Sequence, residues 1–313
     1  MQLLKTWPGD ILDMAYDPSS DAVWVPVVTQ TGDGQSLTEW RDGTQVGSWP
    51  LPSFPFPGIN LRIKVDVGGA VWISTADTMM RFDPASDELA SYAFSGDVIG
   101  GLPAATQDVI GGGSAITGFA LDGTDALVAR NNVPYLTRLG PALTQTATIP
   151  LPAGYAGATD LAVTADHNIY LDLWESMGGV AILSPAGAAL SFEPGNGERL
   201  AVIDGQVLQS GVGGPPTWVT LGKGPATAAA IPPDRMIVVG DPRGGLTVAV
   251  PTGVERVVDS TVVDRVSIPL TTVSTHAGGA LGGVPLFQPT AIVTDSSGMT
   301  WLAAGTELFA VTL

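Results

Sequence analysis

Two histidines and a series of aspartates are the side chains whose types and positions suggest chemistry. The histidines are His167 and His276, and the chain has no cysteine. An imidazole can serve as an acid, a base or a metal ligand. His167 lies in the short polar segment 165–168, which is typical of a solvated hairpin turn. His276 lies in a glycine-rich segment without a carboxylate nearby. We therefore predict no catalytic residue.

The aspartates recur at similar places, each after a short apolar run and before another. A ring of carboxylates would suit a divalent cation, but aspartate at a fixed place in a repeated hairpin is also the ordinary turn former, because its side chain bonds its own backbone. We favour the turn role and predict no metal site. The positions are Asp17, Asp66, Asp122, Asp166, Asp204, Asp241 and Asp295.

Glycine-rich segments do not form a phosphate-binding loop in this sequence. Neither 111–114 nor 277–283 is followed by the Gly-Lys-Ser/Thr that such loops need. We interpret the first as a linker and expect no nucleotide or other cofactor.

The elements that position these residues are repeated pairs of short strands. The segments 11–25, 61–74 and 291–302 each show an apolar strand, an aspartate-led turn and a second strand that carries tryptophan. Weaker copies lie between them, and the turn aspartates recur 37 to 56 residues apart. Repeats of this length with about four strands each are typical of a β-propeller. We predict an all-β, seven-bladed β-propeller, with six or eight blades as the alternatives.

The repeated aromatic residues on the second strands have two interpretations. Trp24, Trp72, Tyr170 and Trp301 would suit an aromatic cage for a ligand, but their fixed position in the repeat favours packing between neighbouring blades. The last repeat ends after three strands, and residues 2–7 form an extra apolar strand at the start. We predict that this N-terminal strand pairs into the last blade, which closes a single propeller domain over residues 1–313.

Composition narrows the setting. The chain has 40 glycines and 25 prolines among its 313 residues, but 45% hydrophobic residues and a mean hydropathy of +0.29 argue against disorder. The formal charge of −17 disfavours nucleic acid as a partner. No apolar run is long enough to cross a membrane, and the first residues lack the pattern of a signal peptide. We expect no membrane insertion and a virion or cytoplasmic location.

Several repeats end in a common phrase, which points to a family. Ser48-Trp49-Pro50-Leu51-Pro52 and Thr148-Ile149-Pro150-Leu151-Pro152 precede a loop, an apolar strand, an aspartate-led turn and a second strand. This order resembles the repeat of streptogramin-lyase-like propellers and is similar to the wider NHL-like and SMP-30-like group. None of the eight tryptophans precedes an aspartate, which gives a WD40 assignment no support.

The resemblance implies a fold more than an activity. Streptogramin lyases use magnesium, a histidine and glutamates on strands that read much like Trp-Phe-Thr-Glu, whereas the matching strands here, 72–75 and 301–304, have no glutamate. A metal-dependent lyase or lactonase remains the alternative function. Its ligands would come from the starts of the first strands, where Asn60, Asp160 and Asp234 are the residues in reach.

Long connections between repeats give the leading hypothesis. In a propeller, the loops that join one blade's last strand to the next blade's first strand emerge on one face, and here they include 51–59, 95–115, 151–158 and 271–288. We predict that this face binds a protein or a host-surface glycan, and that the chain is a non-catalytic binding or assembly module, for example a phage tail or host-recognition component with virion neighbours. The predicted binding residues are Phe54, Phe56, Asp97, Asp108, Tyr155, His276 and Phe287.

Overall fold

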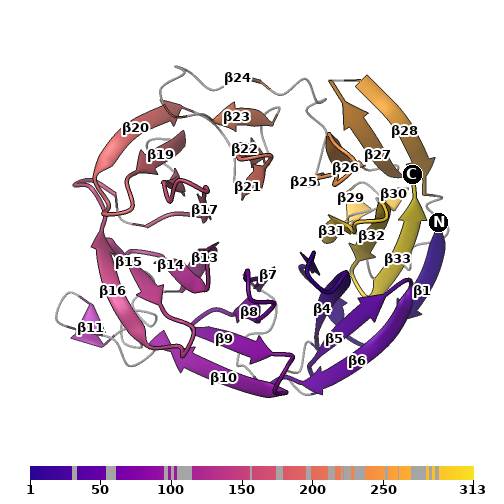
Figure 1. The fold of residues 1–313 in the computed structure, drawn as a ribbon, viewed down its shortest axis with the longest axis horizontal. Helices are drawn as coiled ribbons and strands as arrows, with labels where there is room; N and C mark the ends of the chain where they lie inside the picture. Colours follow the sequence, from indigo (N-terminus) through magenta and orange to yellow (C-terminus); the bar gives the residue numbers. More distant parts are fainter. Residues whose placement is uncertain are drawn as a thin grey trace. The chain divides into compact units, whose positions relative to one another are not determined.

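The computed structural model consists of antiparallel β-sheets joined by turns and loops (Figure 1). It describes residues 1–29, 34–53, 61–94, 98–99, 102–103, 115–155, 157–173, 179–194, 199–210, 216–219, 221, 227–228, 237–250, 253–259, 261–268, 280–281, 284–285 and 289–313. These residues contain no helix long and apolar enough to cross a lipid bilayer. Seven sheets of four or five strands carry the repeats, and we call each sheet a blade.

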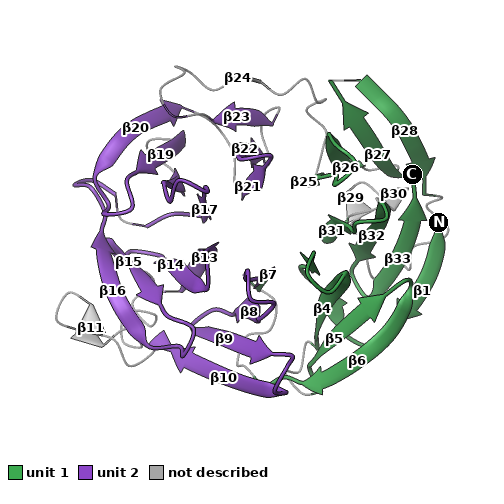
Figure 2. Cartoon of the chain, viewed as in Figure 1, with its two compact units in different colours: residues 1–63, 230–313 green, residues 64–229 purple. Residues whose placement is uncertain are grey.

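The chain divides into two compact units, residues 1–63 with 230–313, and residues 64–229 (Figure 2). Blades 1, 6 and 7 lie in the first unit. Blade 1 contains β2 (Asp10–Ile11), β3 (Ala15–Asp17), β4 (Ala22–Val28), β5 (Ser36–Arg41) and β6 (Thr44–Pro50). Blade 6 contains β25 (Ile237–Gly240), β26 (Leu246–Val250), β27 (Gly253–Val258) and β28 (Thr261–Ser267). Blade 7 contains β31 (Ala291–Thr294), β32 (Met299–Ala304), β33 (Glu307–Thr312) and β1 (Gln2–Thr6).

The second unit holds blades 2 to 5, although the first two residues of blade 2 belong to the first unit. Blade 2 contains β7 (Arg62–Val65), β8 (Val71–Ser74), β9 (Thr78–Asp83) and β10 (Glu88–Ala93). Blade 3 contains β13 (Ile116–Asp122), β14 (Asp125–Arg130), β15 (Tyr135–Leu139) and β16 (Gln145–Pro150). Blade 4 contains β17 (Asp160–Val163), β18 (Ile169–Leu173), β19 (Gly179–Leu183) and β20 (Ala189–Pro194). Blade 5 contains β21 (Arg199–Ile203), β22 (Gln206–Ser210), β23 (Thr217–Val219) and β24 (Thr227–Ala228).

Two further pairs of short strands lie in the longest connections between blades. They are β11 (Val98–Ile99) with β12 (Leu102–Pro103), and β29 (Ala280–Leu281) with β30 (Val284–Pro285).

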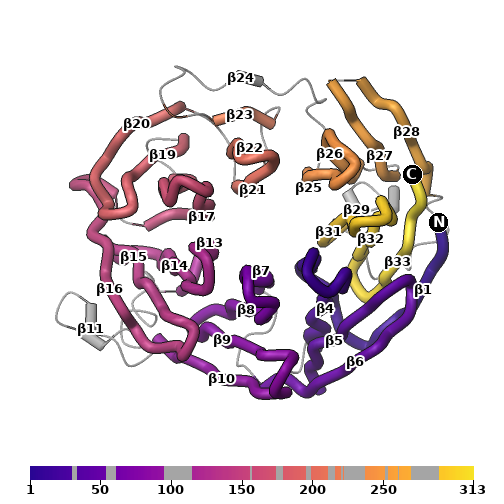
Figure 3. Tube along the Cα trace, in the orientation of Figure 1, coloured from indigo at the N-terminus to yellow at the C-terminus, as the bar shows by residue number. Residues whose placement is uncertain are grey.

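The predicted fold class is confirmed: the chain is an all-β, seven-bladed β-propeller. The predicted role of the N-terminal strand is also confirmed, because β1 pairs antiparallel with β33 and completes blade 7 (Figure 3). Trp7 strengthens this closure, since its backbone N–H donates to Thr306 and its ring meets Trp40 edge to face at 5.7 Å. That residues 1–313 form a single domain stays a prediction.

Burial explains the sequence pattern of the strands. The second strands, such as β4, β8, β18 and β26, are buried at every position, which is why they read as continuous apolar runs rather than as alternation. The fourth strands β16 and β28 are mostly exposed and β6 alternates between exposed and half-buried positions. Within each unit, hydrophobic clusters join successive blades, as where Trp72 of blade 2 packs with Phe119 and Val128 of blade 3.

The two ends of each blade hold different connections between strands. We call the end that holds the turns between first and second strands, and between third and fourth strands, the turn end. The opposite end, which holds the turns between second and third strands and the connections to the next blade, is the loop end. The turn aspartates lie at the turn end, and Tyr155 lies at the loop end.

Candidate functional site

Two of the repeated aspartates organise their hairpins in the same way. Asp66 Oδ1 accepts the backbone N–H groups of Gly68 and Ala70 at 2.8 and 3.1 Å, and its Oδ2 accepts the indole N–H of Trp72 at 2.9 Å. Asp295 repeats these bonds with Ser297, Met299 and Trp301 at 3.0, 3.0 and 2.9 Å. Both carboxylates are buried. Their hydrogen bonds fit the predicted role as turn formers and add a tryptophan six residues later as a partner.

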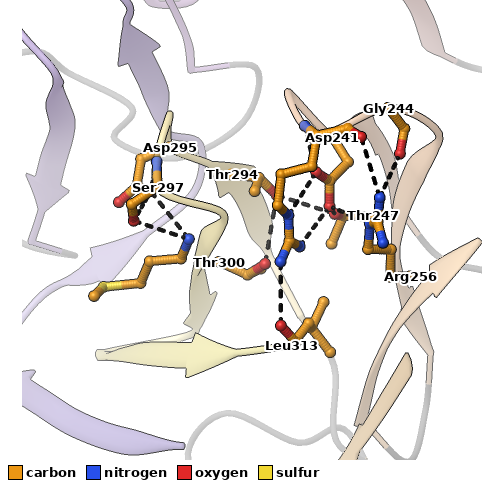
Figure 4. Close-up of polar contacts among 11 residues, drawn as sticks. Asp241, Gly244, Thr247, Arg256, Thr294, Asp295, Ser297, Thr300 and Leu313 are labelled. Carbon is orange, nitrogen blue, oxygen red and sulfur yellow. Dashed lines mark hydrogen bonds and ion pairs between the residues drawn. The ribbon is translucent and has the colours of Figure 1, made fainter. Parts of the chain in front are cut away.

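Asp241 has the same place in blade 6, with arginine partners instead of tryptophan (Figure 4). Its carboxylate accepts Arg243 Nε at 3.0 Å, Arg243 Nη2 at 2.7 Å and Thr247 Oγ1 at 3.1 Å, and Arg256 Nε lies 3.3 Å away. Burial alone would raise the pKa of the Asp241 carboxyl, but the bonds from Arg243 and Thr247 hold that pKa below its usual value. The group therefore stays ionised as part of a closed network.

The predicted register of the aspartates is wrong in blade 4. The hairpins of blades 2, 6 and 7 share two backbone hydrogen bonds. The N–H of the turn aspartate donates to the carbonyl of the residue four positions later, and the carbonyl of the aspartate accepts the N–H of the residue three positions later. In blade 4 the residue that makes both bonds is Thr164, and Asp166 lies two positions further along. Asp166 caps the turn from outside by accepting Thr164 Oγ1 and the Asn168 amide at 2.5 and 2.6 Å.

Blades 3 and 5 also depart from the shared hairpin. Asp122 pairs with Asp125 across a two-residue turn, and Ile203 pairs with Gln206 across the turn that contains Asp204. The sequence spacing of the aspartates therefore grouped the shared hairpin with the two-residue turns of blades 3 and 5, and only backbone geometry separates them.

The predicted packing of the repeated aromatic residues agrees with their burial. Trp24, Trp72, Trp301 and Tyr170 are at most 5% exposed. Trp301 packs in the cluster between blades 7 and 1, and Tyr170 in the cluster between blades 4 and 5.

His167 is exposed, as predicted, but it also joins two blades. Its Nδ1 lies 2.5 Å from Asp122 Oδ1 in blade 3, and Arg138 Nη1 holds the other carboxylate oxygen at 2.8 Å. His167 has a φ of 61°, at the position where the equivalent hairpins have Gly69, Gly244 and Gly298 with φ of 83°, 93° and 84°. The sequence predicted the turn. It did not predict the contact with Asp122, 45 positions earlier, because that contact depends on how blades 3 and 4 pack.

Of the seven predicted binding residues, the structure describes Tyr155. The other six, Phe54, Phe56, Asp97, Asp108, His276 and Phe287, lie outside the described residues. Tyr155 ends a turn in which its N–H donates to Pro152 O at 3.1 Å, at the loop end of blade 3, and it packs against the core between blades 3 and 4.

Two turns meet at this loop end. The segment 131–134 joins β14 to β15, and the segment 151–158 leads from β16 to blade 4. Leu151 N donates to Pro134 O at 2.9 Å. A Cβ added at Gly157, whose φ is 125°, would lie 2.9 Å from Arg130 O and 3.3 Å from Asn132 N. Glycine is required here because the two backbones touch.

A buried arginine, Arg130, ends β14 just before the first of these turns. Arg130 is 1% exposed, its guanidinium lies 4.4 Å from the centre of the Phe94 ring, and its Nη2 lies 3.3 Å from Tyr135 Oη. A guanidinium stacked on an aromatic ring gains attraction that grows on removal from water. Arg130 thus fixes the position of Tyr135. No sequence pattern predicted this residue; the available signal was an arginine that directly follows the apolar residues 126–129 of β14.

A long insertion, residues 95–115, begins and ends next to Arg130. Phe94 and Ile116, which bracket residues 95–115, donate their N–H groups to the adjacent carbonyls of Asp77 and Ala76 at 2.8 and 2.7 Å. Asn131 N donates to Ala115 O at 2.8 Å. Both ends of the insertion are therefore anchored next to each other and next to Arg130. We call Phe94, Arg130–Tyr135 and 151–155 with Gly157 the blade 3 loop site.

The candidate metal ligands of the alternative function can be examined at one position. Asp160 is buried, and its two carboxylate oxygens accept the N–H groups of Leu161 and Leu200, each at 2.9 Å. Asp13 makes equivalent bonds with Met14 and Ile63. Asn60 and Asp234 lie outside the described residues. Among the residues that are described, no group of three or more His, Asp or Glu side chains is arranged to hold a metal ion.

Comparison with solved structures agrees on the fold. The structure of U3-55K aligns over 100% of this chain and 98% of its own, with a TM-score of 0.69 and 10% identity. The WD40 propeller domain of Doa1 aligns over 98% and 95%, with a TM-score of 0.64 and 10% identity. The extracellular domain of a two-component system, BT3049 from B. thetaiotaomicron, gives 0.64 and 10%, and the chain spans 40% of its length.

Sequence comparison adds no family. No protein-family model matches the chain, and no curated protein matches it.

Proposed function

We propose that this propeller is a non-catalytic binding module that engages its partner through the blade 3 loop site. The observation that carries the proposal is that two turns, 131–134 and 151–155, meet at the anchored base of a 21-residue insertion, where the buried Arg130 contacts Phe94 and Tyr135. Loops set on a rigid scaffold are the usual position of recognition residues. The two N–H groups that Asp160 accepts, from Leu161 and Leu200, give this carboxylate a structural role between blades 4 and 5.

The biological setting is a finer part of the proposal. The absence of cysteine, the charge of −17 and the scarcity of lysine and histidine favour a virion component, such as a tail or host-recognition protein of a phage. The repeat phrases favour descent from the streptogramin-lyase-like, NHL-like or SMP-30-like propellers. Mass spectrometry of purified particles tests the setting, and absence of the chain from them would refute it.

Replacement of the insertion tests the binding function. Because Phe94 and Ile116 bond adjacent carbonyls, a short glycine-serine turn can replace residues 95–115 without moving the strands. We expect this variant to keep its melting temperature and to lose its partners in affinity capture from native extract. A matched variant shortens the 140–144 turn at the turn end of the same blade. Undiminished capture by the first variant would contradict the proposal.

Metal-dependent catalysis has its own test. Isothermal titration with Mg²⁺ and Ca²⁺ should show no submillimolar site. Uptake at one site, lost on substitution of Asp160, would favour the lyase or lactonase instead.

A further inference from the structure

Each blade has an outer strand, the last member of its sheet, whose far edge pairs with no other strand in the described part of the chain. The outer strands are β6, β10, β16, β20, β24, β28 and β1. Such an edge offers a row of backbone N–H and C=O groups to any extended chain, and proteins usually block it with a bulge, proline, lysine or a very short strand. The blocks that each outer strand carries therefore indicate where another chain can pair.

Bulges interrupt four of the outer strands at one place. Near the turn end of blades 1, 3, 4 and 6, the ladder between the third and fourth strands skips one residue of the outer strand. The skipped residues are Val46, Thr146, Leu190 and Val263, and all four are exposed. A bulge bends its strand and increases the local twist, which hinders the pairing of a further straight strand.

Blade 2 is the exception among the outer strands. β1 skips Leu4 and contains Lys5, and β24 has only two residues. In contrast, β10 pairs with β9 at every position from Glu88 to Ala93 without a shift in register. β10 contains no proline, lysine or arginine. It is therefore the outer strand best suited to accept a further strand.

The side chains of β10 leave room for those of a neighbouring strand. Ala90, Ser91 and Ala93 are small and exposed, and Leu89 and Tyr92 are half buried. Side chains directly opposite each other on paired strands make contact, so small residues on one strand leave space for β-branched or aromatic residues on the other. The partner strand can thus carry the bulkier side chains.

Both ends of β10 are held in place before any partner arrives. At the loop end, the ring of Tyr92 meets that of Phe94 edge to face at 4.9 Å, and Tyr92 Oη donates to Gln145 Oε1 of blade 3 at 3.4 Å. At the turn end, Asp83 Oδ1 accepts the N–H of Ala85 at 3.0 Å. An edge that is already ordered reduces the entropy lost when a flexible segment binds.

Charge is concentrated at one end of the strand. The turn end holds Asp83, Asp87 and Glu88, and the rest of β10 is uncharged. The nearest basic residue on β9, Arg81, is engaged within the blade, where its Nε lies 3.7 Å from Asp66 Oδ2. A basic residue of a partner would therefore meet carboxylates at this end, which favours one direction of binding.

We infer that β10 accepts an extended segment of a protein partner as an added antiparallel strand, with a lysine or arginine near the C-terminal end of that segment. β10 runs from the turn end to the loop end, so an antiparallel segment ends beside Asp83 and Glu88. Main-chain hydrogen bonds give such strand addition its affinity. β10 leads directly into Phe94 of the blade 3 loop site. The inference rests on the proposed binding function and names the kind of partner.

The test uses the full chain and a displayed library of random dodecapeptides. Selected peptides are synthesised and titrated by fluorescence anisotropy, and hydrogen exchange maps the amides that they protect. We expect protection in β10 and a lysine or arginine near the C-terminus of the peptides. N-methylation of alternate peptide amides should weaken binding by about tenfold, because it removes main-chain donors.

One pair of variants makes the same change on two outer strands. Ser91→Lys should weaken peptide binding by about tenfold, because a lysine on an edge strand hinders pairing. Thr148→Lys is the control and should leave the affinity unchanged, since Thr148 is also exposed but lies on the bulged strand β16. Both variants should keep their melting temperature. Equal losses in the two variants, no effect of N-methylation, or no selected peptide at β10 would overturn the inference.

Affinity capture separates this inference from the binding module. If replacement of residues 95–115 abolishes capture of a protein, Ser91→Lys does not, and no peptide binds β10, then the strand inference fails and the binding module stands. If both variants keep every partner and no peptide binds, both proposals fail.

Discussion

At the scale of single residues, buried aspartates accept hydrogen bonds from N–H groups that have no backbone carbonyl partner within the hairpin. Asp66 satisfies two backbone N–H groups and an indole N–H with one side chain. Loss of such an acceptor leaves buried donors without a partner, and each costs about 1–3 kcal/mol. The aspartate is therefore a structural requirement of the repeat rather than a surplus acidic group.

Substitution of Asp66 tests this role. We expect Asp66→Ala to lower the free energy of unfolding by about 3 kcal/mol, measured by urea denaturation. Asp83→Ala is the matched control, because the Asp83 carboxylate accepts the exposed N–H of Ala85. Equal effects of the two substitutions would contradict the role.

His167 combines a strained backbone with a contact between blades. His167→Gly loses the contact with Asp122 but relieves the left-handed backbone, so we expect a change in unfolding free energy within about 1 kcal/mol. His167→Ala loses the contact and keeps the strain, and should be less stable than His167→Gly by about 1 kcal/mol. Denaturation of both variants side by side measures the difference, and an alanine variant as stable as the glycine variant would refute the strain.

The carboxyl of Asp122 makes the stability from its contacts with His167 and Arg138 depend on pH in the acid range. Burial raises the pKa of the Asp122 carboxyl, but hydrogen bonds from His167 and Arg138 outweigh it and lower the pKa below the usual value. A lowered pKa stabilises the folded state above the unfolded pKa of about 3.9, and this stability is lost as pH falls through the folded pKa. We expect Asp122→Asn to flatten the decline of unfolding free energy between about pH 5 and pH 2.

The measurement is urea unfolding at several pH values for the wild type and Asp122→Asn. Asp17 and Asp241 also have lowered pKa values, so part of the slope should remain. A slope identical to that of the wild type would show that the link contributes nothing.

Residue patterns predicted some of these features and missed others for physical reasons. The hairpins of Asp66 and Asp295 were predicted because aspartate, glycine and the flanking apolar runs are local signals. The position of Thr164 in its hairpin was missed because a threonine can take the position that aspartate has in the equivalent hairpins. Arg130 and the partner of His167 were missed because their contacts come from other strands or blades, and spacing within one repeat does not report them.

At the scale of elements, the first strand closes blade 7. β1 pairs with β33 from Gln2 to Thr6, and Lys5 Nζ donates to Gln45 Oε1 at 2.6 Å. The three-strand count of the last repeat predicted this pairing, because an open edge strand usually has a partner. The loop connections were predicted only as lengths, since glycine-rich segments carry no periodicity that specifies their contacts.

Removal of this strand tests the closure. We expect deletion of residues 1–8 to lower the melting temperature sharply, and Trp7→Ala to account for about 3 kcal/mol through its lost packing on Trp40. Leu3→Thr serves as the control, because Leu3 lies on the same strand with 45% of its surface exposed. An unchanged melting curve after the deletion would remove the closure.

At the scale of the whole molecule, charge and surface chemistry differ from place to place. The chain carries a net charge of −17, while the blade 3 loop site has no charged surface residue in 131–137 and 151–159. A strongly acidic protein repels anionic polymers. The net charge therefore disfavours nucleic acid and other polyanions as partners of the proposed binding module.

Photo-crosslinking tests the central claim, that the blade 3 loop site is the binding surface, most directly. A benzophenone amino acid is placed at Tyr155 in one variant and at Asp204, in the turn end of blade 5, in another. Irradiation in native extract, followed by mass spectrometry, should give crosslinks from position 155 that disappear when residues 95–115 are replaced, and none specific to position 204. Crosslinks from position 204 alone, or equally from both positions, would contradict the account.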